Sequence, residues 1–232
     1  TSWWKECPDY VDWTKRYSVD KKNPMVATKN NGWDINCTII GNTPLPQNKV
    51  TSWSIKILKS KSNNGNGIYI GVAPSDINQN VSFNYNKCGW HFDCYDSTLW
   101  SGPPHNYEHK EYGPIKKIRE YIHTGDSVGV VMDTAKGELS FVLNGVNLGV
   151  AFDGIPLDKP LVPCVLLRFG GDSVELDTSE VKERVNSSIP VPSSIATKST
   201  TWDSITLSWD VVEGASFYQI EMDGSKFWDA ST

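Results

Sequence analysis

The stretch from Gly125 to Phe152 most constrains the fold of this chain, because it reads as three short strands joined by two turns. Large apolar residues occupy every second position from 128 to 132 and again from 139 to 143, which is the spacing of a strand with one buried face. The Asn144-Gly145 pair favours a two-residue hairpin turn, since both residues tolerate a positive φ. Alternation resumes from 146 to 150. The sequence therefore predicts an antiparallel meander.

The composition favours a β-sandwich and argues against several kinds of partner. Ten Trp, nine Tyr and seven Phe in 232 residues are typical of a sandwich interior. The net charge of −5 argues against an extended nucleic-acid surface. No stretch approaches the roughly 18 apolar residues of a membrane span. We therefore predict neither a nucleic-acid partner nor a membrane partner.

The five cysteines are odd in number and scattered along the chain: Cys7, Cys37, Cys88, Cys94 and Cys164. Such a set is not the framework of a disulfide-stapled domain. It favours a reducing compartment, and we predict a cytoplasmic location.

Further landmarks flank the meander on both sides. Val50 to Leu58 alternates like a strand, and the run IYIGVA from Ile68 to Ala73 reads as another. GWHFDCYDSTLWSG follows from Gly89 to Gly102, and VPCVLLRFGGDSVEL closes the region from Val162 to Leu176. From these strands alone we expect an antiparallel sandwich or barrel.

In this order, the landmarks resemble the SPRY domain over roughly residues 10 to 176. GDSVGVVMD, ELSFVLNG and LGVAF are similar to its central signature, and Gly89, Trp90 and Asp93 match a GW-x-x-D strand. The resemblance implies an all-β fold, a bent antiparallel β-sandwich of the concanavalin-like kind. It also implies a non-catalytic interaction module that binds a peptide segment or a partner protein through loops at one end, as part of a larger adaptor or ubiquitin-ligase-like protein.

The same resemblance places the binding residues. Trp100 falls where peptide-binding members carry an aromatic residue, and Phe169-Gly170 falls where they often carry Trp-Gly. We expect Trp100 and Phe169 to form an apolar floor, and the loop from Gly41 to Asn48 to form one wall. Asn144 is expected at the opposite end. The complete set of candidate partner-binding residues is Trp100, Arg168, Phe169, Gly170, Asp96 and Tyr107.

Motifs that suggest catalysis or metal binding lack the expected context. GDSVG from Gly125 to Gly129 matches the G-x-S-x-G elbow, but a strand pattern follows it instead of a helix. Cys88, Cys94, His105 and His109 do not have the spacing of a structural zinc site. We predict no catalytic residue, no metal and no cofactor.

Two other function classes stay open. A lectin-like sandwich would bind a glycan, with Trp100 stacking on a sugar. If the lectin were calcium-dependent, the few candidate calcium ligands would be Asp93, Asp96 and Asn106. Alternatively, the chain is a purely structural segment of a multidomain protein.

The C-terminal residues form a separate segment. NSSIPVPSS, residues 186–194, has the composition of a linker, and residues 195–232 resume a β pattern that resembles the first strands of a fibronectin type III domain, with Trp209 as its core residue. That sandwich takes about 100 residues, so we expect only a partial one, with strands available for self-association. The predicted division is an extension (1–9), a SPRY domain (10–185), the linker (186–194) and the fibronectin-like segment (195–232).

Overall fold

Strands are the regular secondary structure of the described part of the chain, which confirms the all-β prediction. The computed structural model describes residues 3–7, 16–30, 36–61, 65–79, 89–113, 122–179, 181, 196–201, 205–208, 217–222 and 225–231. Two units, Thr1–Glu183 and Arg184–Thr232, are described separately below. None of the described residues forms a helix long and apolar enough to cross a membrane.

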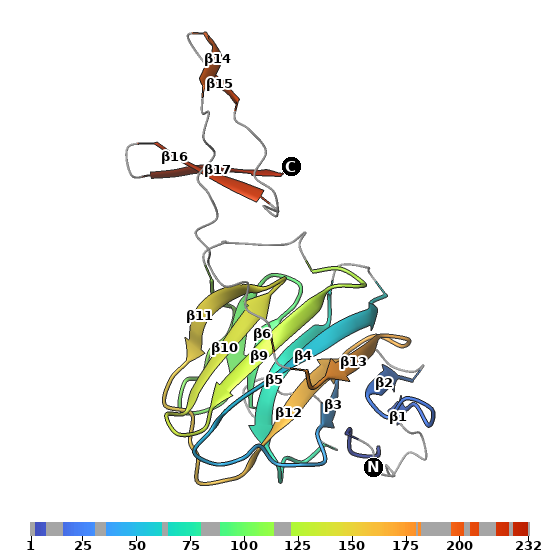
Figure 1. Cartoon of the computed structure of the whole chain (residues 1–232). Coiled ribbons are helices and arrows are strands. Elements are labelled where there is room, and N and C mark those ends of the chain that lie inside the picture. Colours follow the sequence, from blue (N-terminus) through green and yellow to red (C-terminus); the bar gives the residue numbers. More distant parts are fainter. Residues whose placement is uncertain are drawn as a thin grey trace. The chain divides into compact units, whose positions relative to one another are not determined.

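Seven strands of the first unit form one antiparallel sheet in the order β1-β2-β13-β4-β9-β10-β11, which runs from one side of Figure 1 to the other. The predicted meander supplies β9, β10 and β11 in sequence. The bounds of the seven strands are β1 Tyr17–Val19, β2 Val26–Lys29, β4 Val50–Lys59, β9 Ser127–Asp133, β10 Glu138–Leu143, β11 Val146–Phe152 and β13 Ser173–Asp177.

A second antiparallel sheet has six strands in the order β3-β12-β5-β6-β7-β8. These strands are β3 Cys37–Ile40, β5 Ile68–Pro74, β6 Trp90–Asp93, β7 Thr98–Ser101, β8 Lys110–Glu111 and β12 Leu161–Leu167.

The core lies where the two sheets face each other. Phe92 of the six-stranded sheet stacks on Phe141 of the seven-stranded sheet, with ring centroids 5.2 Å apart. The residues predicted for the core are all buried and belong to one cluster: Trp53, Trp90, Leu139, Phe141 and Leu148. In β9 and β10 the predicted apolar positions are the buried ones, so the predicted periodicity is confirmed for these two strands. In β11, whose pairing with β10 contains register shifts, Leu148 is buried but Val146 and Val150 are exposed, so the predicted alternation is wrong there.

Strand direction defines two ends of the sandwich. The Arg168 end carries the β12–β13 loop (168–172), the β4–β5 and β6–β7 connections and the β10–β11 turn; the Leu157 end carries the β3–β4, β9–β10 and β11–β12 connections. Asn144 and Gly145 form the expected tight turn, with φ of 50° and 84°, and Asn144 is exposed. This turn lies at the Arg168 end, so its predicted position at the opposite end is wrong.

The chain leaves β13 across the outer face of the seven-stranded sheet. The backbone N–H of Val181 donates to Oγ of Ser52 on β4 at 3.2 Å. A Cβ on Gly129 of β9 would lie 2.7 Å from a methyl carbon of Val181 and 3.0 Å from Cβ of Val142. Val181 therefore occupies a notch that exists because residue 129 has no side chain.

The described residues of the second unit form two antiparallel strand pairs. One pairs β14 Ala196–Thr200 with β15 Ile205–Ser208, and the other pairs β16 Phe217–Met222 with β17 Ser225–Ser231. The predicted linker, residues 186–194, and the predicted core residue Trp209 lie outside the described residues.

Candidate functional site

One buried carboxylate shapes the loop between β12 and β13. Asp172 is fully buried, and its two carboxylate oxygens accept the backbone N–H groups of Phe169 and Lys61, each at 2.9 Å. The N–H of Asp172 donates back to the carbonyl of Phe169 at 3.0 Å, and Gly171 has a φ of 92°, which favours glycine. The loop is thus held by main-chain groups, and its outward side chains are presented on a fixed frame.

The ring of Phe169 is half-buried at this loop and rests on the start of β5. Gly67 has a φ of 81°, and a Cβ there would lie 2.7 Å from Cβ of Arg168 and 3.0 Å from the Phe169 ring. The Phe169 ring can pack against the start of β5 because Gly67 has no side chain. Two cations lie close to the ring, with Nζ of Lys61 5.2 Å and Cζ of Arg168 5.4 Å from the ring centroid, within the range of cation–π attraction.

A second group of polar side chains lies where β6 turns into β7. Oδ1 of Asp96 accepts the hydroxyl of Thr98 at 2.6 Å, and Oδ2 lies 3.3 Å from Nδ1 of His109. The indole N–H of Trp100 donates to the Thr98 hydroxyl at 3.1 Å, and the rings of Trp100 and His109 are 4.0 Å apart. Trp100 is only 8% exposed. Asp96 and His109 therefore form the surface here, with Trp100 beneath them.

Trp100 lies on the outer face of the six-stranded sheet beside a row of buried polar groups. Cross-strand pairing places His91 of β6 next to Trp100, and Asp93 of β6 next to Tyr69 of β5. The pKa of Asp93 is raised to about 7, mainly by burial and also by the charge of Asp96, against the opposing effect of hydrogen bonds from the backbone N–H of Tyr95 and from Tyr69 and Trp100. Burial lowers the pKa of His91 to about 3, so this imidazole is neutral near pH 7.

The structure brings together only part of the predicted site. Arg168, Phe169, Gly170 and Asp96 all lie at the Arg168 end. Trp100 belongs to β7, which is separated from β12 by β5 and β6, a span of about 14 Å at the usual strand spacing. The predicted floor made by Trp100 and Phe169 together is therefore wrong. Because His109 covers Trp100, a sugar ring cannot stack on the face of this indole.

Two predicted parts of the site lie at the Leu157 end. Tyr107 exchanges hydrogen bonds with Ser101, the last residue of β7, and its ring stacks on Phe152 at 5.5 Å. The loop from Gly41 to Asn48 begins with Gly41, whose N–H donates to the carbonyl of Pro163 near the start of β12. β12 is seven residues long and ends just before Arg168, so this loop cannot form a wall beside Phe169.

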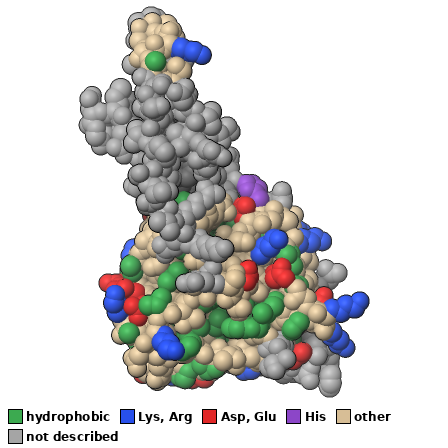
Figure 2. All heavy atoms as spheres, in the orientation of Figure 1, with side chains coloured by type: hydrophobic (Ala, Val, Ile, Leu, Met, Phe, Trp, Pro, Cys, Tyr) green, Lys and Arg blue, Asp and Glu red, His purple; other side chains and the backbone are tan. Residues whose placement is uncertain are grey.

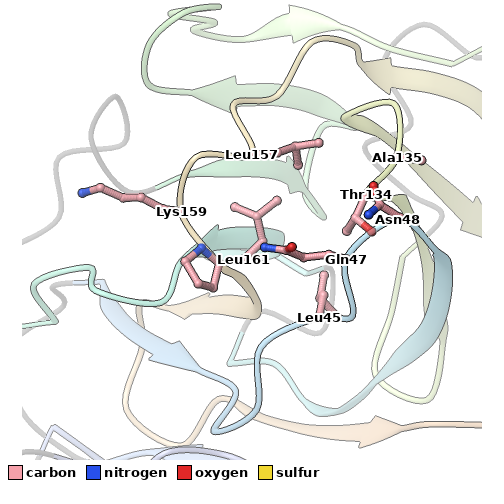
Figure 3. A pocket seen from close by; sticks show the side chains of 9 residues that line it. Leu45, Gln47, Asn48, Thr134, Ala135, Leu157, Lys159 and Leu161 are labelled. Carbon is pink, nitrogen blue, oxygen red and sulfur yellow. The ribbon is translucent and has the colours of Figure 1, made fainter.

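The loop from Gly41 to Asn48 instead helps to line a small pocket, shown in Figure 3. Residues of three connections line it, and two of these connections are joined by hydrogen bonds from the Thr134 hydroxyl to the carbonyls of Pro46 and Lys49. Leu157 and Leu161 contribute apolar walls, while the ammonium of Lys159 points away from the pocket and pairs with Asp76 at 2.8 Å.

The structure shows where the described residues of the candidate catalytic and zinc-binding motifs lie. Ser127 begins strand β9, so the GDSVG motif is not followed by the helix that a nucleophile elbow needs. Cys94 is buried, and Cys88 lies outside the described residues. Among the residues that the structure describes, no three His, Cys, Asp or Glu side chains are placed to hold a metal ion.

Sequence reasoning missed three residues of the Arg168 end: Lys61, Gly67 and Asp172. Lys61 and Asp172 are 111 positions apart, so no local pattern links them. The glycines of the loop before β5 carried a weak signal, because a glycine next to a strand often marks a close approach of another segment.

The surrounding surface has few large exposed apolar side chains; among the described residues these are Val50, Val146, Val150 and Leu157. Figure 2 shows hydrophobic side chains in a band near the middle of one face of the first unit, with charged side chains mostly around its margin.

Comparisons with known proteins agree with the fold. A family model described as "SPRY domain" matches residues 50–179. The crystal structure of the SPRY domain of human HERC1 superposes with a TM-score of 0.54 at 20% identity, covering 71% of this chain and 93% of that one. The crystal structure of a human SPRY domain gives 0.55 at 16% identity, covering 72% and 97%. No curated protein sequence matches the chain.

Proposed function

This chain belongs to the SPRY domain family, whose members are generally protein-interaction modules, and we propose that it binds a peptide segment of a partner protein at the Arg168 end without catalysing a reaction. The two solved SPRY structures support the fold of the scaffold, and the loop geometry supports the choice of end.

One observation carries the proposal: a half-exposed aromatic ring is fixed on a rigid loop at the end of a sandwich. Phe169 needs little additional ordering on binding, because Asp172 already holds its backbone and Gly67 already seats its ring. An aromatic residue presented in this way provides apolar contact at a low cost in conformational entropy.

The other residues have distinct roles in this proposal. Arg168 is exposed beside the ring and meets a carboxylate or a backbone carbonyl of the peptide. Gly170 leaves room for the peptide backbone. Asp96 forms the surface of the neighbouring turn, and Trp100 supports Asp96 from beneath through Thr98.

The test is affinity capture with the whole chain, followed by binding measurements on each captured protein with matched variants at both ends. Phe169→Ala and Arg168→Ala remove the proposed contacts. Leu157→Ala and Lys136→Ala are the matched controls, since both residues are exposed at the Leu157 end.

Loss of an aromatic anchor costs roughly 2–4 kcal/mol, so we expect Phe169→Ala to weaken binding about thirty-fold or more. Melting temperatures of all four variants must match that of the unsubstituted chain. If the Leu157 and Lys136 variants lose binding while the Phe169 and Arg168 variants keep it, the site is at the other end.

The wider setting of the module belongs to the same proposal. We infer a cytoplasmic adaptor or ubiquitin-ligase-like protein, which the four described cysteines support because they are buried thiols outside any disulfide. We further propose that the second unit is the beginning of a fibronectin type III-like sandwich and that its strands offer edges for self-association. Its two antiparallel strand pairs support this interpretation.

A further inference from the structure

Three cationic side chains surround the 168–172 loop of a protein whose net charge is −5. Lys61 and Arg168 both lie within cation–π distance of the Phe169 ring. Nζ of Lys59 lies 3.7 Å from the position that a Cβ on Gly171 would occupy. Lys59, Lys61 and Arg168 are all exposed. A local excess of positive charge on an acidic protein indicates an anionic ligand.

The fold brings these three residues together from separate elements. Lys59 is the last residue of β4 and pairs with Ser173 at the start of β13. Lys61 follows two residues later and is held by the hydrogen bond from its backbone N–H to Asp172. Arg168 comes from the end of β12, so the cluster exists only in the folded domain.

The carboxylate within this loop, Asp172, is not exposed at the surface. Asp172 is fully buried, and its oxygens accept backbone N–H groups below the loop. Its charge is therefore used in shaping the loop, while the three cationic side chains are exposed at the surface.

We propose that the Arg168 end selects peptides in which an anionic side chain stands next to an apolar residue. This inference rests on the proposed peptide-binding function and names its ligand class. The apolar residue packs on Phe169, and the anionic group, a carboxylate or a phosphate, lies among Lys59, Lys61 and Arg168. The guanidinium of Arg168 suits either group because it donates two parallel hydrogen bonds.

Selection from a random peptide display library on the whole chain tests the ligand class even while the partner is unidentified. Selected peptides are resynthesised and measured against the unsubstituted chain, Phe169→Ala, and the double variant Lys59→Ala/Lys61→Ala. The control double variant Lys21→Ala/Lys22→Ala removes the same charge from the exposed β1–β2 turn at the Leu157 end. Each resynthesised peptide is also made with Asp or Glu replaced by Asn or Gln, and with Ser-phosphate in their place.

We expect peptides enriched in Asp or Glu whose binding is lost with Phe169→Ala and falls about tenfold with Lys59→Ala/Lys61→Ala at low salt. The control double variant should bind within twofold of the unsubstituted chain. Binding should also weaken as salt rises, because exposed ion pairs are screened. Replacement of Asp or Glu in the peptide by Asn or Gln should weaken binding to a similar extent. The peptide with Ser-phosphate in their place should retain binding.

The two proposals fail differently in this experiment. Peptides that depend on Phe169 but show no acidic enrichment and no effect of the lysine substitutions would overturn the anionic ligand class and leave the binding site in place. Peptides that bind equally well to the Phe169→Ala variant would overturn the site itself.

Discussion

At the scale of single residues, the outer face of the six-stranded sheet contains an acid that the fold keeps protonated in mildly acidic solution. Asp93 is buried, with a pKa of about 7 in the folded chain against an ordinary value of 3.8. The folded state therefore binds the proton more tightly than the unfolded state. The contribution of Asp93 to stability is fully present below about pH 4 and is lost as the pH rises through 7.

Asp93→Asn should remove this pH dependence, because an amide cannot ionise. We expect the free energy of unfolding of the variant, relative to the unsubstituted chain, to rise by up to a few kcal/mol between pH 4 and pH 8. Urea unfolding at several pH values measures the difference. A difference that stays flat across this range would show that Asp93 is already ionised at low pH in the folded chain.

Residue-scale prediction from the sequence succeeded where a residue follows a recognisable strand and failed where two distant residues meet. The positions of Phe169 and Gly170 at the end of a closing strand could be read directly. The partnership of Lys61 with Asp172 could not, since the two residues meet only after β4 and β13 pair. The burial of Trp100 was missed because His109, from a later loop, covers it.

At the scale of elements, periodicity predicted β9 and β10 well, because alternating burial is a local property of the chain. It failed in β11, where the pairing with β10 has register shifts and Val146 and Val150 are exposed. The ends at which the connections lie were predicted less well. The loop from Gly41 to Asn48 and the loop from Arg168 to Gly171 were expected side by side, yet β12 separates them along its whole length. Which end a loop occupies depends on the order and direction of strands from distant parts of the sequence.

The segment after β13 offers a prediction at this scale. Gly129→Ala should displace Val181 from its notch, since the added Cβ would lie 2.7 Å from a Val181 methyl group. We expect the free energy of unfolding to fall by about 1 kcal/mol, which is similar to the fall caused by Val181→Ala.

Contact between the two positions makes their effects non-additive. A double-mutant cycle in urea unfolding should show that Val181→Ala costs little once residue 129 is Ala. Fully additive losses would mean that Val181 does not lie over Gly129 in solution.

At the scale of the whole molecule, the buried core is contributed by the first unit alone among the residues whose burial is described. Removal of residues 193–232 should therefore leave the melting temperature of the sandwich within a few degrees. Calorimetry of the shortened and full chains measures this. A collapse of the transition on shortening would show that the C-terminal strands are integral to the sandwich.

The way in which the 168–172 loop is held has a consequence for how such a protein can evolve. Its shape depends on Asp172, on the backbone and on the freedom of Gly171, while the side chains of residues 168 to 170 play little part in closing the turn. Substitutions at these three positions can then alter what is recognised without a matching change in stability. The stability of the scaffold and its binding specificity therefore depend on largely different residues. A duplicated copy of this domain can then acquire a new partner through a few substitutions.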